Sequence, residues 1–242
     1  MWNRIVSSPL VYLFLFAGVI LSYAIGFSLS NRILLPLLNV AFSYPVLYRL
    51  VADGKRNAAF APMLFWAFCM GIVGVVAVLH FPERGANSII YGRTYQAEMF
   101  QWIRTGIGTE SDPWRFLPQH LLHFAIFAVL SLLTASIVSL LMGAVLMNYM
   151  NFYAASVIQA SHNNPAAILM AWHVWAIVRV ASFVMLGVIL GEPGICRLSG
   201  RDYDYEGARP YFWLALTGLV VDIALKTLLA PWWSDTLRKL IA

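Results

Sequence analysis

Apolar residues gather in six long segments along this chain, and short stretches between them carry most of the charged and amide side chains. The segments cover residues 9–29, 33–51, 60–80, 120–147, 166–190 and 211–230. A helix rises 1.5 Å per residue, so about 20 residues cross the hydrocarbon core of a bilayer. The pattern therefore predicts an all-α protein, a polytopic transmembrane helix bundle of six spans.

The segment 33–51 is the least regular of the six. Pro36 and Pro45 interrupt it, and only Asn31 and Arg32 separate it from the first segment. Proline removes a backbone donor and kinks a helix, so this stretch fits two structures. It is either the second span of a tight hairpin or a kinked, partly re-entrant segment, and the bundle then has five spans.

The composition of the chain is typical of an integral membrane protein. Hydrophobic residues make up 61% and charged residues 11%, whereas soluble domains are roughly 45–50% apolar and about 25% charged. We therefore expect residues 1–242 to form a single integral membrane domain whose main partner is the lipid bilayer. Lys and Arg residues that flank spans explain the net charge of +5, and without a basic block we expect no nucleic-acid partner.

Residues 81–119 form the longest polar stretch and are expected to be an extramembrane loop. Within it, Tyr95, Met99, Trp102 and Ile103 share one helical face. This pattern is typical of an interfacial amphipathic helix, with Trp102 at the depth of the lipid headgroups. A helix that caps the bundle and packs on it would give the same pattern.

The number of basic residues does not settle the orientation, because the side opposite the amino terminus carries eight of them, many in the long loop or beside acids. With six spans, one side of the membrane carries basic residues with few acids beside them, namely Arg4, Arg49, Lys55, Arg56, Arg238 and Lys239. Basic residues in short loops favour the cytoplasmic side. We therefore expect a multi-pass protein of the cell membrane with both termini in the cytoplasm.

The longest stretch without a charged residue runs from Phe116 to Val178, 63 residues. It nevertheless contains four histidines and four asparagines: His120, His123, His162, His173, Asn148, Asn151, Asn163 and Asn164. Polar residues without charge suit a partly buried re-entrant turn or a vestibule in the membrane. For the connector before Pro165, the alternative is a simple tight turn of the two asparagines and the proline.

Arg179 is the most informative single residue, because it lies near the middle of segment 166–190. A central Arg costs about 2.5–3.5 kcal/mol on insertion scales, so it must face protein or water. Asp222 in the last segment is its best counter-charge, although Lys226 lies four residues later and can also neutralise Asp222. Trp175 is placed for a cation–π contact with Arg179. A structural tie and a substrate-binding role both fit this pattern.

Two other patterns have structural and functional interpretations. Ser131, Ala135, Ser139 and Gly143 follow one another at four-residue spacing, which predicts a helix-packing face in the fourth span. His120 and His123 share a helical face and are weak candidates for metal ligands. No HExxH motif accompanies them, so a hydrogen-bonded interfacial pair is the favoured interpretation and no metal is expected.

Three functions remain open at this stage. The first is a permease-like or channel-like subunit whose path is lined by Asn148, Asn151, His162, His173, Arg179 and Asp222. The second is a non-catalytic scaffold or assembly subunit that binds partner membrane subunits or a second copy of itself. The third is an intramembrane enzyme with a metal at His120 and His123, for which Glu98 and His173 are further candidate ligands. The sequence has no Walker A, GxSxG or GxGxxG motif, so we expect no cofactor and favour a protein without catalytic activity.

Overall fold

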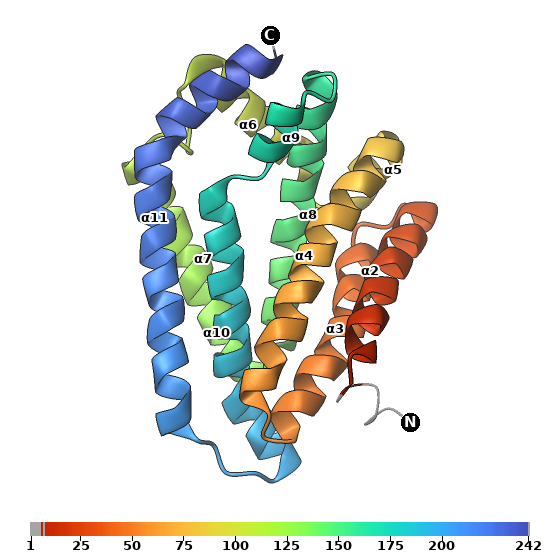
Figure 1. The fold of residues 1–242 in the computed structure, drawn as a ribbon, viewed down its shortest axis with the longest axis vertical. Helices are drawn as coiled ribbons and strands as arrows, with labels where there is room; N and C mark the ends of the chain where they lie inside the picture. Colours follow the sequence, from red (N-terminus) through yellow and green to blue (C-terminus); the bar gives the residue numbers. More distant parts are fainter. Residues whose placement is uncertain (1–5, 7, 242) are drawn as a thin grey trace.

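The computed structural model describes residue 6 and residues 8–241, and within this part of the chain all regular structure is helical. The helices are α2 (Leu10–Leu29), α3 (Leu34–Ala52), α4 (Arg56–His80), α5 (Pro82–Ser88), α6 (Gly92–Thr105), α7 (Pro113–Leu133), α8 (Ile137–Ala160), α9 (Pro165–Ala171), α10 (Val174–Ser199) and α11 (Tyr205–Ile241). The long helices run side by side along the vertical axis of the molecule (Figure 1). The predicted all-α bundle is confirmed.

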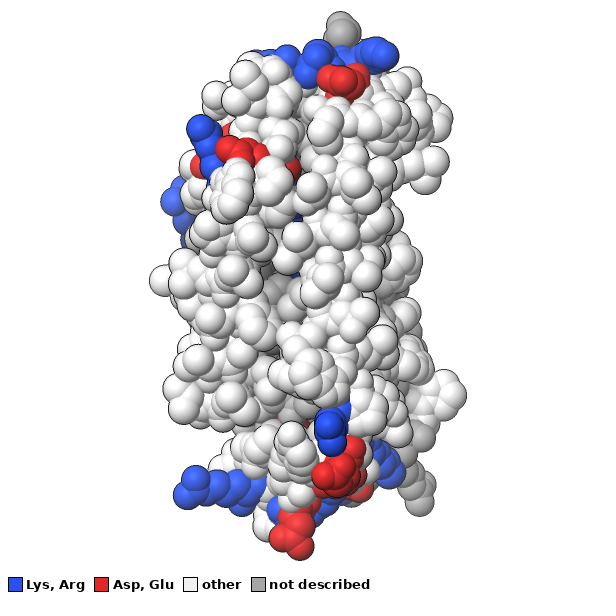
Figure 2. All heavy atoms as spheres, turned by 90° about the vertical axis from the view of Figure 1, so that its left-hand side faces the viewer, with Lys and Arg blue, Asp and Glu red and all other residues white. Residues whose placement is uncertain are grey.

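Among the described residues, seven helical segments are long and apolar enough to cross a membrane. They are α2, α3, α4, α7, α8, the stretch of α9 and α10 taken together, and α11. Charged side chains gather toward the two ends of the molecule and leave a broad uncharged band between them (Figure 2). The chain is therefore a multi-pass membrane protein. Because α3 is one continuous helix with Pro45 inside it, the five-span alternative has no support.

The seventh span arises where the sequence predicted one long helix over 120–147. The chain reverses between α7 and α8, and Ala135 and Ser136 adopt left-handed backbone angles there, with φ of 48° and 68°. The Ser136 hydroxyl donates a hydrogen bond to the carbonyl of Gly187 in α10, which holds the turn. The turn contains no charged residue, glycine or proline, so the hydropathy of the sequence does not reveal it.

An odd number of crossings changes the expected topology. The helix α2 begins at one end of the bundle and α11 ends at the other (Figure 1). The described part of the chain thus begins and ends at opposite ends of the bundle, whereas the expectation of two cytoplasmic termini depends on six crossings. Which end of the bundle faces the cytoplasm stays a prediction.

Two other spans differ from their predicted limits. The segment 166–190 is divided at Trp172 and His173 into α9 and α10, and α10 continues to Ser199. The last span is also longer than 211–230, since α11 contains Pro210 and Pro231 within one helix. The extramembrane loop after α4 ends earlier than predicted, because α7 begins directly after Asp112, whose carboxylate accepts from the Trp114 amide at 3.0 Å.

The helix α6 forms within the loop as predicted, but it packs on the bundle. Its apolar face lies against α8, and α6 also contacts α11. Met99, Trp102 and Ile103 are buried in these contacts, so the apolar face of α6 meets protein and not lipid. The Arg238 guanidinium of α11 donates to the Ile103 carbonyl at 2.8 Å. The capping-helix alternative is therefore the correct one.

Candidate functional site

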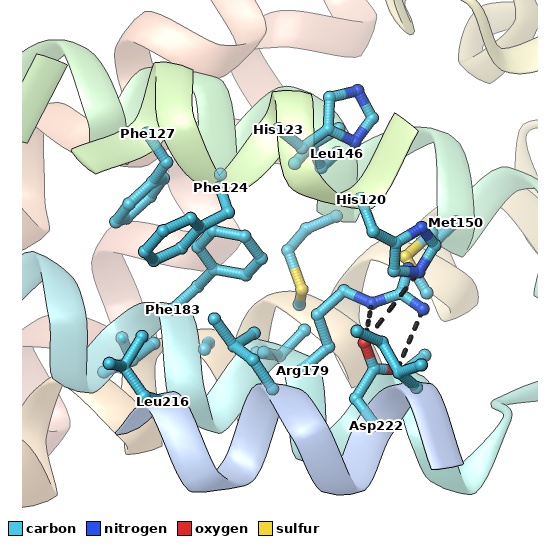
Figure 3. Close-up of a pocket in the computed structure, with 18 of the residues that line it drawn as sticks. His120, His123, Phe124, Phe127, Leu146, Met150, Arg179, Phe183, Leu216 and Asp222 are labelled. Carbon is cyan, nitrogen blue, oxygen red and sulfur yellow. Dashed lines mark hydrogen bonds and ion pairs between the residues drawn. The ribbon is translucent and has the colours of Figure 1, made fainter. Parts of the chain in front are cut away.

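A cavity of about 530 Å³ lies between α7, α8, α10 and α11, with Trp66 and Ala67 of α4 completing its wall. Its size is within the range of small-molecule sites, roughly 300–1,000 Å³. Most of the wall is apolar, and Phe124, Phe127 and Phe183 form one part of it (Figure 3). The cavity is therefore suited to a molecule with a large apolar part.

The cavity opens sideways because two of its walls hardly touch each other. The helix α7 packs on α8 and α10, and α11 packs mainly on α10, while α7 and α11 make little mutual contact. Leu121 of α7 and Trp213 and Val220 of α11 line the cavity, yet their exposed fractions are 56%, 56% and 65%. On this face, blue atoms are visible inside a recess of the uncharged band (Figure 2). The mouth thus lies within the uncharged band, between α7 and α11.

The cavity has one charged end, formed by Arg179 and Asp222. The Arg179 Nε and Nη2 atoms donate to the two carboxylate oxygens of Asp222 at 2.8 and 2.9 Å (Figure 3). Asp222 is buried, whereas 23% of the Arg179 side chain remains accessible. The predicted tie between α10 and α11 is confirmed. Within the described part of the chain, Arg179 Nη1 has no hydrogen-bond partner.

His120 lies beside this pair, on α7. Its Nδ1 donates to the Phe116 carbonyl at 2.9 Å, since a carbonyl can only accept. Its Nε2 is 3.8 Å from an Asp222 oxygen, too far for a hydrogen bond, and this buried atom has no other partner. The His120 ring points toward Arg179 and Asp222, and the His123 ring points away from them (Figure 3).

The metal hypothesis gains no support from this arrangement. His120 and His123 both line the cavity, as their shared helical face suggested. Among the described residues, however, no group of three or more His, Cys, Asp or Glu side chains is placed to hold a metal ion. Glu98, a further candidate, lies on the surface and accepts a hydrogen bond from Tyr91 at 2.5 Å.

A second ion pair lies near the charged end of the cavity. The Lys226 side chain is fully buried, with its Nζ 3.0 Å from the Glu110 carboxylate and 4.4 Å from the centre of the Phe116 ring. Lys226 therefore pairs with Glu110 and not with Asp222 as expected. Burial alone would raise the pKa of Glu110, but the Lys226 charge and other nearby cations outweigh this effect and lower it to about 2. Glu110 precedes α7 in an irregular loop, where no periodicity marks it.

His173 and Trp175 belong to a buried aromatic cluster at the break between α9 and α10. Trp175 stacks on His173, with ring centres 4.6 Å apart, and lies 5.2 Å from Trp233 of α11. The Tyr153 hydroxyl is 3.1 Å from His173 Nε2. The expected cation–π contact between Trp175 and Arg179 does not form, and His173 does not line the cavity.

Asn148 and Asn151 also lie away from the cavity, in a hydrogen-bond network that joins four helices. The Tyr23 hydroxyl of α2 donates to Asn148 at 2.6 Å, and the Asn148 amide donates to Asn39 of α3 at 2.9 Å. The Asn151 amide donates to the Met70 carbonyl of α4 at 2.9 Å. All of these side chains are buried, so the network fixes how α8 packs against α2, α3 and α4.

His162 lies in the connector between α8 and α9 and is exposed. His162 and Asn163 have left-handed φ angles of 52° and 62°, and the Asn164 side chain accepts from the Ala166 amide at 3.0 Å at the start of α9. This is the geometry of the tight turn, and no vestibule forms here. Of the six residues proposed to line a path, only Arg179 and Asp222 line the cavity.

The four small residues expected on one helix are divided by the turn between α7 and α8. Ser131 and Ser139 lie on different helices, and their hydroxyls hydrogen-bond at 2.8 Å. Ala135 lies in the turn and touches Gly194 of α10 so closely that a Cβ on this glycine would be 3.0 Å from the Ala135 Cβ. Gly143 instead faces the cavity, with no atom within 4 Å of a Cβ placed there.

The ion pair at the charged end is thus predictable from the sequence, whereas the cavity itself and Glu110 are not. Comparisons with protein-family models, curated proteins and solved structures gave no match for this chain.

Proposed function

We propose that this chain is a permease-like membrane protein that takes up a lipid-soluble molecule through the gap between α7 and α11. The observation that carries the proposal is the sideways opening of an otherwise apolar cavity at membrane depth. A molecule dissolved in the bilayer reaches this mouth directly. A strongly polar solute would have to leave water and pass apolar walls, which is unfavourable.

The chemistry of the wall favours binding over catalysis. Its polar residues are His120, His123, Tyr149, Arg179, Thr217 and Asp222. The carboxylate is held by Arg179 on both oxygens and is not placed to act as a base toward a nucleophile. A catalytic site usually combines a nucleophile, a base and a group that stabilises developing charge. The few polar groups here are better suited to orienting a bound molecule.

A variant that fills the cavity tests this proposal. At Gly143 a side chain enters open space, so Gly143→Phe should block the cavity, and Gly143→Ala is the matched control with the same backbone change. Protein in lipid nanodiscs is irradiated with a diazirine-labelled long-chain alkyl probe, and the cross-linked residues are mapped by mass spectrometry. We expect cross-links on the cavity walls in the wild type and in Gly143→Ala, and their loss in Gly143→Phe.

Transport is measured separately in proteoliposomes. The movement of a fluorescent long-chain probe between the two leaflets should be faster with wild type and Gly143→Ala than with Gly143→Phe or with empty vesicles. Equal cross-linking of the cavity walls in all three proteins would refute the binding site. Cross-linking that is sensitive to Gly143→Phe without faster movement between leaflets would refute the permease role.

A further inference from the structure

We infer that the charged end of the cavity recognises an uncharged hydroxyl group at the head of a long-chain molecule. This inference rests on the proposed function and specifies its substrate class. The charges at this end of the cavity are already balanced. Arg179 pairs with Asp222, and Lys226 pairs with Glu110. A charged head group would bring an unpaired charge into this largely buried site, which is strongly unfavourable.

Beside the Arg179–Asp222 contact, Arg179 and His120 each keep one hydrogen-bonding atom without a partner among the described residues. Arg179 Nη1 can only donate, and it has no partner among the described residues. In the neutral His120 ring, Nδ1 carries the proton that goes to the Phe116 carbonyl, so Nε2 is an acceptor without a partner. Both side chains line the same part of the cavity (Figure 3). Arg179 and His120 together thus offer one donor and one acceptor.

A hydroxyl group matches this pair, because it accepts one hydrogen bond and donates another. It accepts from Arg179 and donates to His120. An ether or a carbonyl oxygen can only accept and leaves His120 unsatisfied, while a carboxylate adds a negative charge beside Asp222. An ammonium group adds a positive charge beside Arg179.

The remaining shape of the cavity accommodates the chain of such a molecule. From the charged end the walls continue along Phe124, Phe183 and Leu216 to Phe127 (Figure 3). An alkyl chain along these walls has apolar contacts throughout, and it can leave through the mouth beside Leu121. The ligand is therefore a long-chain alcohol, or a neutral lipid with a free hydroxyl group.

A series of ligands with one chain and different heads tests the inference on wild-type protein. Oleyl alcohol, its methyl ether, oleate and oleylamine compete with the diazirine alkyl probe in nanodiscs at mildly alkaline pH, where oleate is ionised. We expect oleyl alcohol to displace the probe at a concentration about tenfold below the methyl ether, as one net hydrogen bond predicts. Oleate and oleylamine should compete less well than the alcohol.

A histidine variant then locates the acceptor. His120→Phe should reduce oleyl alcohol to the level of the methyl ether, whereas His80→Phe, at an exposed position of α4 outside the cavity, should keep the difference. The wild-type series remains decisive even if His120→Phe fails to fold.

The outcomes separate this inference from the proposed function. Oleate or oleylamine as the best competitor, or equal competition by alcohol and ether, would refute hydroxyl recognition and leave the lipid-soluble substrate in place. If no member of the series displaces the probe and Gly143→Phe binds it normally, the cavity is not a ligand site and both proposals fail.

Discussion

Gly143 and Gly191 occupy neighbouring membrane helices but have opposite surroundings. A Cβ at Gly143 would touch nothing within 4 Å, whereas a Cβ at Gly191 would overlap the Ser136 hydroxyl in the turn before α8. We expect Gly143→Ala to raise the free energy of unfolding by up to about 1 kcal/mol, the difference in helix propensity. Gly191→Ala should lower it by about 1–3 kcal/mol through overpacking. Thermal unfolding in detergent measures both, and shifts in the same direction would contradict the packing described.

Glu110 makes the stability of the folded protein depend on pH in the acid range. Its pKa in the folded protein is lowered from 4.5 to about 2, so folding favours the ionised carboxylate. The stabilisation is complete above pH 4.5 and is lost as the pH falls toward 2. At neutral pH, Glu110→Gln should cost about 3–5 kcal/mol, because Lys226 loses its buried partner.

The measurement is the difference in apparent melting temperature between wild type and Glu110→Gln across this pH range. We expect the difference to shrink as the pH falls, because protonation removes the same charge from the wild type. Glu83→Gln, at an exposed surface pair, is the control and should show a small difference throughout. A Glu110→Gln difference that does not change with pH would exclude the buried ion pair.

These residues also show what could be predicted at this scale. Arg179 and Asp222 were paired from sequence because an isolated charge inside a bilayer is costly and few opposite charges are within reach. Glu110 was missed because nothing in an irregular loop indicates which of its acids folds back onto a helix. The same lack of long-range information hid the network of Asn148 and Asn151 with Tyr23 and Asn39.

At the scale of helices, hydropathy located the membrane segments but not the turn between α7 and α8. Thr134, Ala135 and Ser136 carry no signal that ends a helix, and the turn is stabilised by contacts with α10, distant in sequence. The amphipathic pattern of α6 was sufficient to predict a helix, since its period follows from its own residues. Whether that face meets lipid or protein depends on α8 and α11, which a local pattern cannot reveal.

The contact between α10 and α11 provides a prediction at this scale. Removing one partner of the Arg179–Asp222 pair leaves an unpaired charge in the membrane, so Arg179→Met and Asp222→Leu should each cost about 3–5 kcal/mol. The double variant removes both charges and should be close to wild type in stability. Melting temperature and the amount of protein in the membrane measure this cycle.

The double variant also separates folding from ligand binding. If the pair holds the helices together and also orients a ligand, the double variant should be stable and should have lost its preference for oleyl alcohol over the methyl ether. A double variant that loses as much stability as the two single variants together would show that the residues act independently. This result would contradict the bidentate contact between Arg179 and Asp222.

For the whole molecule, an all-α membrane bundle followed from composition and segment length alone, because the bilayer leaves few alternatives for apolar segments of this length. The gap between α7 and α11 could not be predicted from composition and segment length. Apolar residues occupy the outer face of α7 and also most of its cavity face, so the sequence does not distinguish a side that meets lipid from a side that lines a cavity. This distinction requires the packing of all the helices.

The number of crossings yields a test of the whole topology. In the seven-span bundle, the connector before α9 lies on the same side as α5, and α4 begins on the opposite side (Figure 1). In a six-span topology with one helix over 120–147, that connector would instead share a side with the start of α4. Arg84, Asn57 and Ala166 are exposed at these three places and are suitable positions for single cysteines.

The cysteines are introduced one at a time after Cys69 and Cys196, which are both buried, have been replaced by alanine. Intact cells and inverted vesicles are treated with a membrane-impermeant maleimide. We expect Ala166→Cys to be labelled from the same side as Arg84→Cys, and Asn57→Cys from the other side. If Ala166→Cys is labelled together with Asn57→Cys, the chain crosses once between residues 113 and 160, and the hairpin of α7 and α8 that builds the cavity does not exist in the membrane.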